Sequence, residues 1–109
     1  MVDANAATMV VAMIRHIVLL ELTEDSTDAD ADAIVQALST LPGRIPSIRS
    51  YVFGRDLRLA EGNVDVSAVA DFDDLAGYEA YRDHEAHKQV IADFIKPVLA
   101  SRHAIQFEY

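Results

Sequence analysis

Residues 64–72 read Val-Asp-Val-Ser-Ala-Val-Ala-Asp-Phe, and residues 85–98 read Glu-Ala-His-Lys-Gln-Val-Ile-Ala-Asp-Phe-Ile-Lys-Pro-Val. In the first stretch apolar residues occupy every second position, which predicts a strand with one buried face. In the second stretch the apolar positions 90, 91, 94, 95 and 98 follow the helical period, and Pro97 is expected to bend or end the helix. A short strand followed by an amphipathic helix is typical of a small α+β domain.

The rest of the chain supplies three more strands and two more helices. The same alternation predicts strands over residues 13–22, 48–55 and 101–109, with a loop over residues 56–63. A helix is expected to begin at Thr27 or Asp28 and to stop before Pro42 and Gly43, a shorter one to begin at Asp73 or Asp74, and the last one at Asp83. The order β-α-β-β-α-α-β predicts a ferredoxin-like fold, an antiparallel four-stranded sheet with its helices on one face.

Such a sheet has a second face that its own helices cannot cover. Apolar candidates for this open face are Ile17, Leu19, Tyr51, Phe53 and Val69. Because burial of each such side chain is worth roughly 1.5–3 kcal/mol, we expect a homodimer in which two sheets face each other.

Length and composition fit one compact domain. The chain has 109 residues, is 51% hydrophobic and has no cysteine, so no disulfide framework is available. We expect a weakly structured tail over residues 1–12, a domain over residues 13–109 and a cytoplasmic location. Met1, Met9 and Met13 are all candidate translation starts.

Charge and hydropathy exclude two classes of partner. Eighteen acidic residues against nine basic ones give a formal net charge of −9, which repels a nucleic-acid backbone. No apolar run approaches the roughly 20 residues needed to cross a bilayer, so no membrane partner is expected.

Two patterns look like metal sites and fail on spacing. Counted from Asp28, a calcium loop would need glycine and glutamate where the chain has Ala33 and Ser39, so the acidic residues 24–32 fit a helix start better. His84 and His87 are three positions apart, whereas the zinc motif of metalloproteases separates its histidines by four. No metal site and no cofactor is expected.

Residues 81–87, Tyr-Arg-Asp-His-Glu-Ala-His, carry the chemistry of the chain. His87 opens the apolar stripe of the last helix, so we expect it to face inward, where an imidazole can act as a base near neutral pH. The phenol of Tyr81 can donate a hydrogen bond to a developing enolate oxygen. The structural alternative is that Tyr78 and Tyr81 belong to the core, that a histidine at the helix start only hydrogen-bonds the backbone, and that His103 is a satisfied structural residue.

One constellation resembles a known family, the stress-responsive A/B barrel (Dabb) domain. It consists of His16 in the first strand, Gly54-Arg55-Asp56 ending the second, the Tyr-x-x-His-x-x-His of residues 81–87, and an aromatic-rich last strand. The resemblance covers residues 13–109 and implies a dimeric α/β barrel. Glu85 stands where the family often has proline, which concerns the turn more than the chemistry.

A plant polyketide cyclase of this fold works without a cofactor, and the resemblance implies that Tyr81 and His87 form an acid/base pair. It also places His16 close to the pocket, and we expect His16, His84 and Tyr78 to contact substrate or to orient His87. The hypothesis is a cofactor-independent cyclase, isomerase or lyase acting on a small aromatic or polyketide-like carbonyl compound.

Two alternatives stay open. One is a dimeric protein that binds a small apolar or phenolic molecule, or serves a stress response, without turnover. The other is an oxygen-using monooxygenase, which ranks last because the chain has no haem or flavin signature.

Overall fold

The computed structural model describes residues 12–109, so the tail predicted over residues 1–12, with Met1 and Met9, lies outside the described residues except for its last position. The elements follow the predicted order, and their bounds are β1 (Ile14–Leu22), α2 (Asp28–Ser39), β2 (Ser50–Arg55), β3 (Val66–Phe72), α3 (Leu75–Arg82), α4 (Glu85–Val90), the π-helical turn η1 (Ile91–Ile95), the 3₁₀ turn η2 (Lys96–Val98) and β4 (Leu99–Glu108). Within residues 12–109, no helix has the length and apolar character that a membrane crossing requires.

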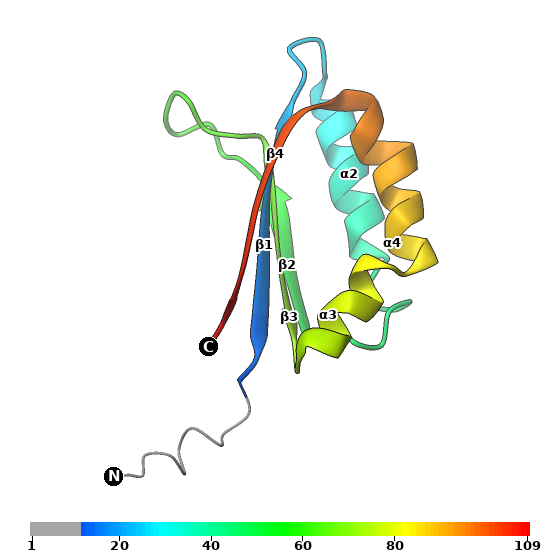
Figure 1. Ribbon diagram of the computed structural model, residues 1–109. Coiled ribbons are helices and arrows are strands. Elements are labelled where there is room, and N and C mark those ends of the chain that lie inside the picture. Colours follow the sequence, from blue (N-terminus) through cyan, green and yellow to red (C-terminus); the bar gives the residue numbers. More distant parts are fainter. Residues whose placement is uncertain (1–11) are drawn as a thin grey trace, which may run out of the picture.

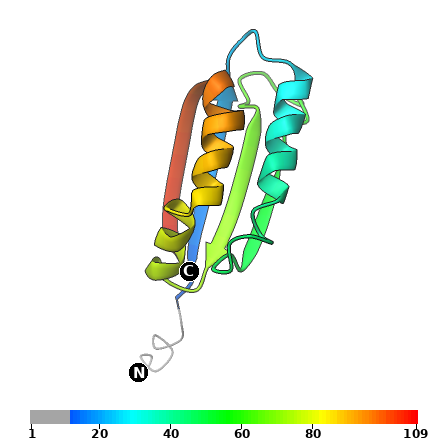
Figure 2. The same ribbon diagram turned by 90° about the vertical axis from the view of Figure 1, so that its right-hand side faces the viewer.

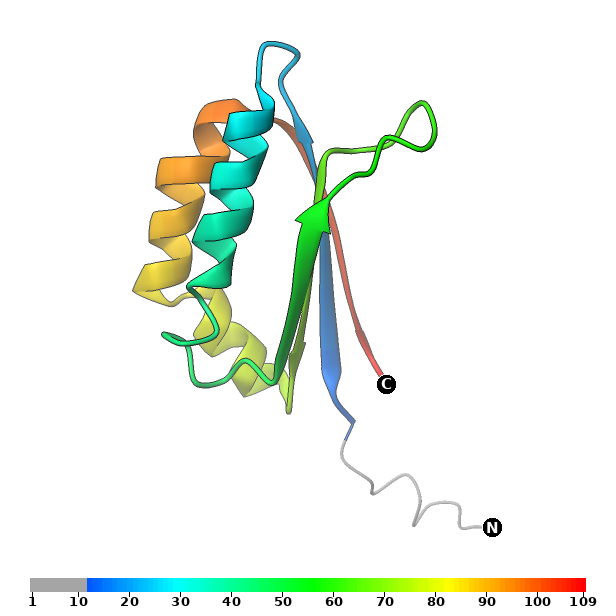
Figure 3. The ribbon, with the colours of Figure 1, turned by 180° about the vertical axis from the view of Figure 1, so that it is seen from behind.

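The strands form one antiparallel sheet in the order β2-β3-β1-β4. All helices lie on one face of it, and the other face is open (Figures 1 and 3). This is the predicted ferredoxin-like α+β fold, and the prediction is confirmed.

The core lies between the sheet and the helices. Its fully buried large side chains come from both layers and from the segment after α2, and they are Phe72, Ile34, Leu41, Ile45 and Val66. Since every second residue of a strand faces the same side, this core selects one register for each strand.

Tyr51 and Phe53 do not lie on the open face, and that part of the prediction is wrong. Tyr51 pairs across the strands with Ala70, and Phe53 with Ala68. Both alanines are buried under the helices, so their partners share that side. The small alanine side chains leave room for the two rings.

The first two helices begin at predicted caps. Thr27 accepts a hydrogen bond from the Asp30 N–H at 3.2 Å, and the Asp30 carboxylate accepts one from the Thr27 N–H at 2.8 Å, which completes a capping box. Asp74 caps α3 by accepting from the Gly77 N–H at 2.8 Å.

The predicted cap of the last helix is wrong by one residue. Asp83 instead ends α3, and its carboxylate accepts two hydrogen bonds from Arg82, both at 2.9 Å. The cap of α4 is His84, whose Nδ1 accepts from the Ala86 N–H at 3.0 Å. An imidazole nitrogen with a free lone pair can fill the role that a carboxylate usually has at this position.

The last helix changes its winding before it ends. After α4 the chain widens into the π turn η1 and then tightens into η2, which contains Pro97. Proline has no N–H for the helical ladder, so the regular pattern cannot continue through it. The predicted end of the helix at Pro97 is confirmed.

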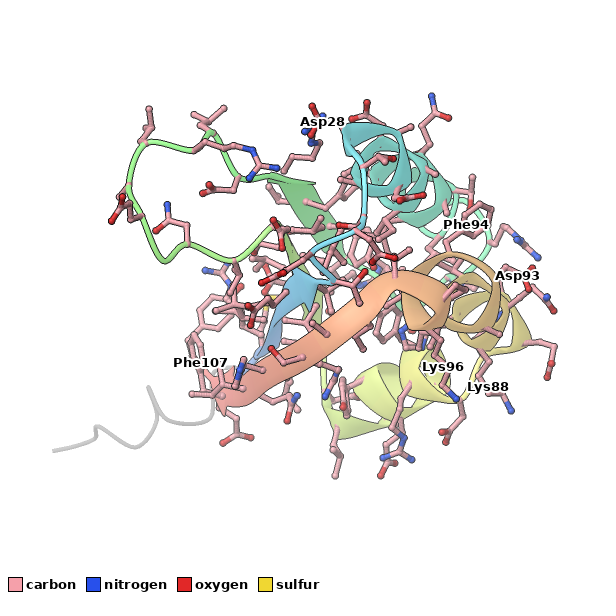
Figure 4. All side chains as sticks on the ribbon, turned by 90° about the horizontal axis from the view of Figure 1, so that it is seen from above. Asp28, Lys88, Asp93, Phe94, Lys96 and Phe107 are labelled. Carbon is pink, nitrogen blue, oxygen red and sulfur yellow. The ribbon has the colours of Figure 1, made fainter. Side chains whose placement is uncertain are left out.

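The open face carries several exposed apolar side chains. Val52 is 65% exposed, Ile105 57%, Phe107 41% and Leu19 37%. Phe107 lies on the side away from the helices (Figure 4), and the 56–65 loop projects toward that side (Figure 1). β4 forms the sheet edge beyond α4, so its inner face is poorly covered by helices (Figure 2).

Candidate functional site

A cavity of about 310 Å³ lies between the sheet and the last helix. This volume is at the lower end of the roughly 300–1,000 Å³ typical of ligand pockets. Its apolar wall includes Val18, Leu20, Leu38, Ile91 and Ile95. Its polar side chains are His16, Tyr51, Tyr81, His87, Arg82, Lys96 and Arg102.

A larger hollow of about 620 Å³ lies on the open face, between Leu19 and the 56–65 loop. It is shallow, and its lining contains no histidine or tyrosine. The inner cavity is the better candidate because it is enclosed by the core and combines apolar walls with titratable groups.

His87 and Tyr81 meet at the wall of the inner cavity. Their ring centroids are 4.1 Å apart at an interplanar angle of 32°, a tilted stack. The α3–α4 turn allows this contact, because Tyr81 lies in the last turn of α3 and His87 in the first turn of α4. Tyr81 is only 2% exposed, so the stack belongs to the core.

The tautomer of His87 follows from its hydrogen bond. Nδ1 lies 3.1 Å from the carbonyl oxygen of Arg82, and a carbonyl only accepts, so Nδ1 carries the proton. Nε2 is then the basic nitrogen of the ring. Burial lowers the pKa of His87, although the bond to the Arg82 carbonyl opposes this shift. His87 is therefore neutral at pH 7 and able to accept a proton.

Tyr81 shares its hydroxyl group with a second tyrosine. The hydroxyl oxygens of Tyr81 and Tyr51 are 3.1 Å apart, and either can donate. Only one of the two hydroxyl groups donates its proton to this bond. The hydroxyl that accepts keeps its own proton, which it can donate to a ligand. Burial raises the pKa of both phenols, so both remain protonated at neutral pH.

His16 forms the sheet side of the site. It is 4% exposed, and its Nδ1 lies 2.9 Å from the Nε2 amide of Gln106, so Nδ1 accepts and the proton resides on the ring's own Nε2. Burial lowers the pKa of His16 to about 4, with a further contribution from the positive charge of Arg102. At neutral pH the cavity thus contains one imidazole that can accept at Nε2 and one that can donate there.

The other predicted residues lie outside the lining. Tyr78 packs against His16, with centroids 5.4 Å apart, and against Phe72, with centroids 5.8 Å apart. His84 caps α4. His103 is exposed on the open face and paired across the strands with Leu19, and its side chain makes no hydrogen bond within residues 12–109, whereas a satisfied side chain was expected.

Sequence reasoning missed Tyr51 and the three basic residues of the lining. The prediction for Tyr51 fails because alternation assigns the residues of a strand to two faces without showing which face the helices cover. Arg102 and Gln106 lie on the same side of β4 because they are an even number of positions apart. The sequence does not show that this side of β4 contacts His16. Nothing in the sequence marks Lys96 or Arg82 as a site residue, because exposed lysines and arginines are common on helices.

The lining does not resemble a metal centre. Within residues 12–109, no three histidine, cysteine, aspartate or glutamate side chains gather closely enough to hold an ion. The groups that can act chemically are two imidazoles and two phenols, which suit proton transfer and hydrogen bonding.

Comparison with solved structures places the fold among known proteins. A dimeric ferredoxin-like protein of unknown function from Thermobifida fusca is 43% identical, with a TM-score of 0.83, over 90% of this chain and 92% of that chain. A Dabb family protein from Mesorhizobium loti is 21% identical, with a TM-score of 0.73, over 88% and 95% of the two chains. A hydroxynitrile lyase from Passiflora edulis is 14% identical, with a TM-score of 0.78, over 91% and 94%.

The similarities to the Mesorhizobium loti protein and to the Passiflora edulis lyase show the fold alone. The comparison with curated proteins gave no match. A model of the stress responsive A/B barrel domain matches residues 14–109, nearly the whole of the described chain. The chain therefore belongs to the stress responsive A/B barrel domain family.

Proposed function

We propose that the protein is a cofactor-independent enzyme, a lyase, isomerase or cyclase acting on a small aromatic or polyketide-like carbonyl compound. His87 is the base, and the Tyr81–Tyr51 pair is the hydrogen-bond donor to the developing oxyanion. The observation that carries the proposal is the stack of His87 on Tyr81 at the wall of an apolar cavity, with Nδ1 of His87 held by the Arg82 carbonyl.

The reaction begins with proton transfer to Nε2 of His87. If the proton comes from a carbon beside a carbonyl, the electron pair moves to the carbonyl oxygen, which accepts the free hydroxyl proton of the tyrosine pair as a hydrogen bond. The raised pKa of Tyr81 favours this role over full proton donation. His16, which donates at Nε2, supplies a second hydrogen bond to the substrate.

The hydroxynitrile lyase of Passiflora edulis suggests a concrete reaction of this type. In the same reaction on this protein, His87 would take the proton of a cyanohydrin hydroxyl, the bond to the nitrile carbon would break, and the carbonyl would form. The imidazolium would then return its proton to cyanide. No cofactor is needed at any step.

We also propose that the protein is a homodimer whose sheets pack through their open faces. The Thermobifida fusca relative is described as dimeric, and the open face of this chain exposes Val52, Ile105 and Phe107. Contiguous apolar surface of this kind favours a protein interface.

The test uses two probes. The first is α-hydrogen exchange of 1-phenyl-1,3-butanedione in D₂O followed by NMR, and the second is release of benzaldehyde from mandelonitrile. We expect the protein to accelerate at least one of them, with a loss of about 100-fold in His87→Gln and a smaller loss in Tyr81→Phe.

His103→Gln serves as the matched control, because His103 lies away from the cavity, on the open face, and its rate is compared at a concentration where sedimentation gives both proteins the same oligomeric state. Its rate should equal that of the unmodified protein. If His87→Gln reacted as fast as that control with every probe that turns over, the acid/base proposal would be wrong.

A dimeric binding protein without turnover is the second candidate. It is favoured by the lowered pKa of His87, which makes the imidazole a weaker base than usual. Ligand binding that survives His87→Gln, together with no acceleration of either probe, would support it.

A further inference from the structure

The charged side chains of the inner cavity are all basic. Arg82, Lys96 and Arg102 belong to its lining, and no carboxylate of the described residues does. The chain as a whole has 18 acidic and nine basic residues, so this local excess of positive charge runs against its composition. A cavity that gathers cations in an acidic protein favours an anionic ligand.

Two of these cations have no anionic partner among the residues that the structure describes, 12–109. Arg82 is held by Asp83, whereas Lys96 and Arg102 form no ion pair within residues 12–109. Most of the other basic side chains are paired, including Arg15 with Asp71. Within residues 12–109, three Lys or Arg side chains form no ion pair, and two of them, Lys96 and Arg102, line the cavity, whereas the third, Arg44, does not.

Their positions place them at its mouth. Arg102 lies on the inner face of β4, opposite Leu20 and on the same side as Gln106. Lys96, labelled in Figure 4, lies in η2, which leads from the last helix into β4. Both side chains are exposed to solvent, whereas His16 and Tyr81 are buried. The cavity therefore has an apolar, aromatic interior and a cationic mouth.

The positive charge at the mouth also reaches the interior. Burial is the main cause of the lowered pKa values of His16 and His87, and Arg102 lowers both further. This agrees with a cation close to the site that no carboxylate of the described part of the chain neutralises.

We propose that the ligand of this cavity is a small aromatic acid, with its ring among the apolar walls and its carboxylate between Arg102 and Lys96. The inference rests on the proposed function, since it concerns the same site, and it names the chemical class of the substrate. Arg102 and Lys96 are binding residues in this scheme, and the proton transfer stays with His87.

The experiment compares 2-naphthoate with 2-naphthamide, which have the same ring system and nearly the same shape but differ in charge. Their affinities are measured by calorimetry or NMR titration of the full chain at pH 7.5. We expect the acid to bind about five to ten times more tightly than the amide, because charge-assisted hydrogen bonds at an exposed site are of moderate strength. Raising the salt concentration should weaken binding of the acid alone.

The double variant Arg102→Gln/Lys96→Gln should lose this preference and keep its affinity for the amide, which also reports that the cavity is intact. Arg44→Gln/Lys88→Gln is the matched control, because it removes the same charges from positions outside the cavity lining. It should keep the preference for the acid.

Three results would overturn the inference: equal affinities for acid and amide, a preference that survives the double variant, or no binding of either probe at millimolar concentration. Equal affinities are also the result expected if a carboxylate from a second copy of the chain neutralised Arg102 and Lys96. A preference for the acid together with an unchanged rate in His87→Gln would instead overturn the proposed chemistry and leave the anion site standing.

Discussion

His16 is the most buried of the four histidines, and it is paired with one amide rather than with a carboxylate. Within residues 12–109, no negative group compensates its protonated form, so burial keeps it neutral. His87 lies in a similar environment but retains a lone pair at Nε2. At the residue scale, the site consists of neutral groups whose hydrogen bonds fix which atoms donate and which accept.

The first prediction concerns His16 and stability. Its pKa is about 4 in the folded protein, against an ordinary value of 6.5 for a histidine in the unfolded chain, so the unfolded chain binds the proton first as the pH falls. The contribution of His16 is therefore present above pH 6.5 and is lost between pH 6.5 and 4, by about 2–3 kcal/mol after allowance for solvent in the cavity.

Denaturant unfolding at fixed protein concentration measures this effect. The free energy of unfolding of the unmodified protein should fall more steeply with decreasing pH than that of His16→Gln. Because carboxylates titrate in both proteins, only the difference between the two curves belongs to His16. Parallel curves would contradict the folded-state pKa.

The second prediction concerns the pH dependence of the reaction. Burial lowers the pKa of His87 below 6.5, so the basic form predominates at neutral pH. The rate with a turned-over probe should rise with pH only below pH 6.5 and stay level from there to about pH 8. A rate that continues to rise through pH 7 to 8 would assign the base to another group.

At the scale of elements, the α3–α4 turn decides the geometry of the site. Asp83 ends α3, His84 caps α4, and this turn brings Tyr81 and His87 into contact. By capping α4, His84 helps to fix the position of His87 in the first turn of that helix.

The third prediction tests that cap. His84→Ala removes the acceptor for the Ala86 N–H and should lower the free energy of unfolding by about 1 kcal/mol. His84→Asn restores a side-chain acceptor and should recover most of the loss. Chemical denaturation of the three proteins measures this, and equal midpoints would show that the cap contributes nothing.

At the scale of the whole molecule, one face of the sheet is packed and the other is open. The helices cover only one side of the sheet (Figure 1). That side contains the core and the cavity, whereas the open side exposes Val52, Ile105 and Phe107. The proposed dimer would cover this face without covering the helical layer.

The fourth prediction tests the dimer with a matched pair of variants. Ile105 is 57% exposed on the open face, and Leu75 is 58% exposed at the start of α3. Ile105→Glu would bury a charge in the interface and should raise the dimer dissociation constant at least about tenfold, whereas Leu75→Glu should not change it.

Analytical ultracentrifugation over a concentration series gives the dissociation constants. A 12.0 kDa species for the unmodified chain at micromolar concentration would remove the dimer proposal. Equal effects of the two substitutions would place the interface elsewhere.

The element order and the fold class could be predicted from local sequence patterns alone. Alternation in residues 64–72 and the helical period over residues 90–98 are local patterns, and caps such as Thr27 and Asp74 act within one turn, so each can be recognised without the rest of the chain. The Tyr81–His87 segment was recognisable for the same reason.

The side of β2 and of β4 that faces the helices could be read only from the folded molecule. Tyr51 and Phe53 belong to the packed side because their strand pairs with Ala70 and Ala68, and pairing partners lie far apart in the sequence. Arg102 reaches the site for the same reason, through a strand pairing that joins the end of the chain to its beginning. Alternation defines two groups of residues in a strand, and long-range packing selects the one that is buried.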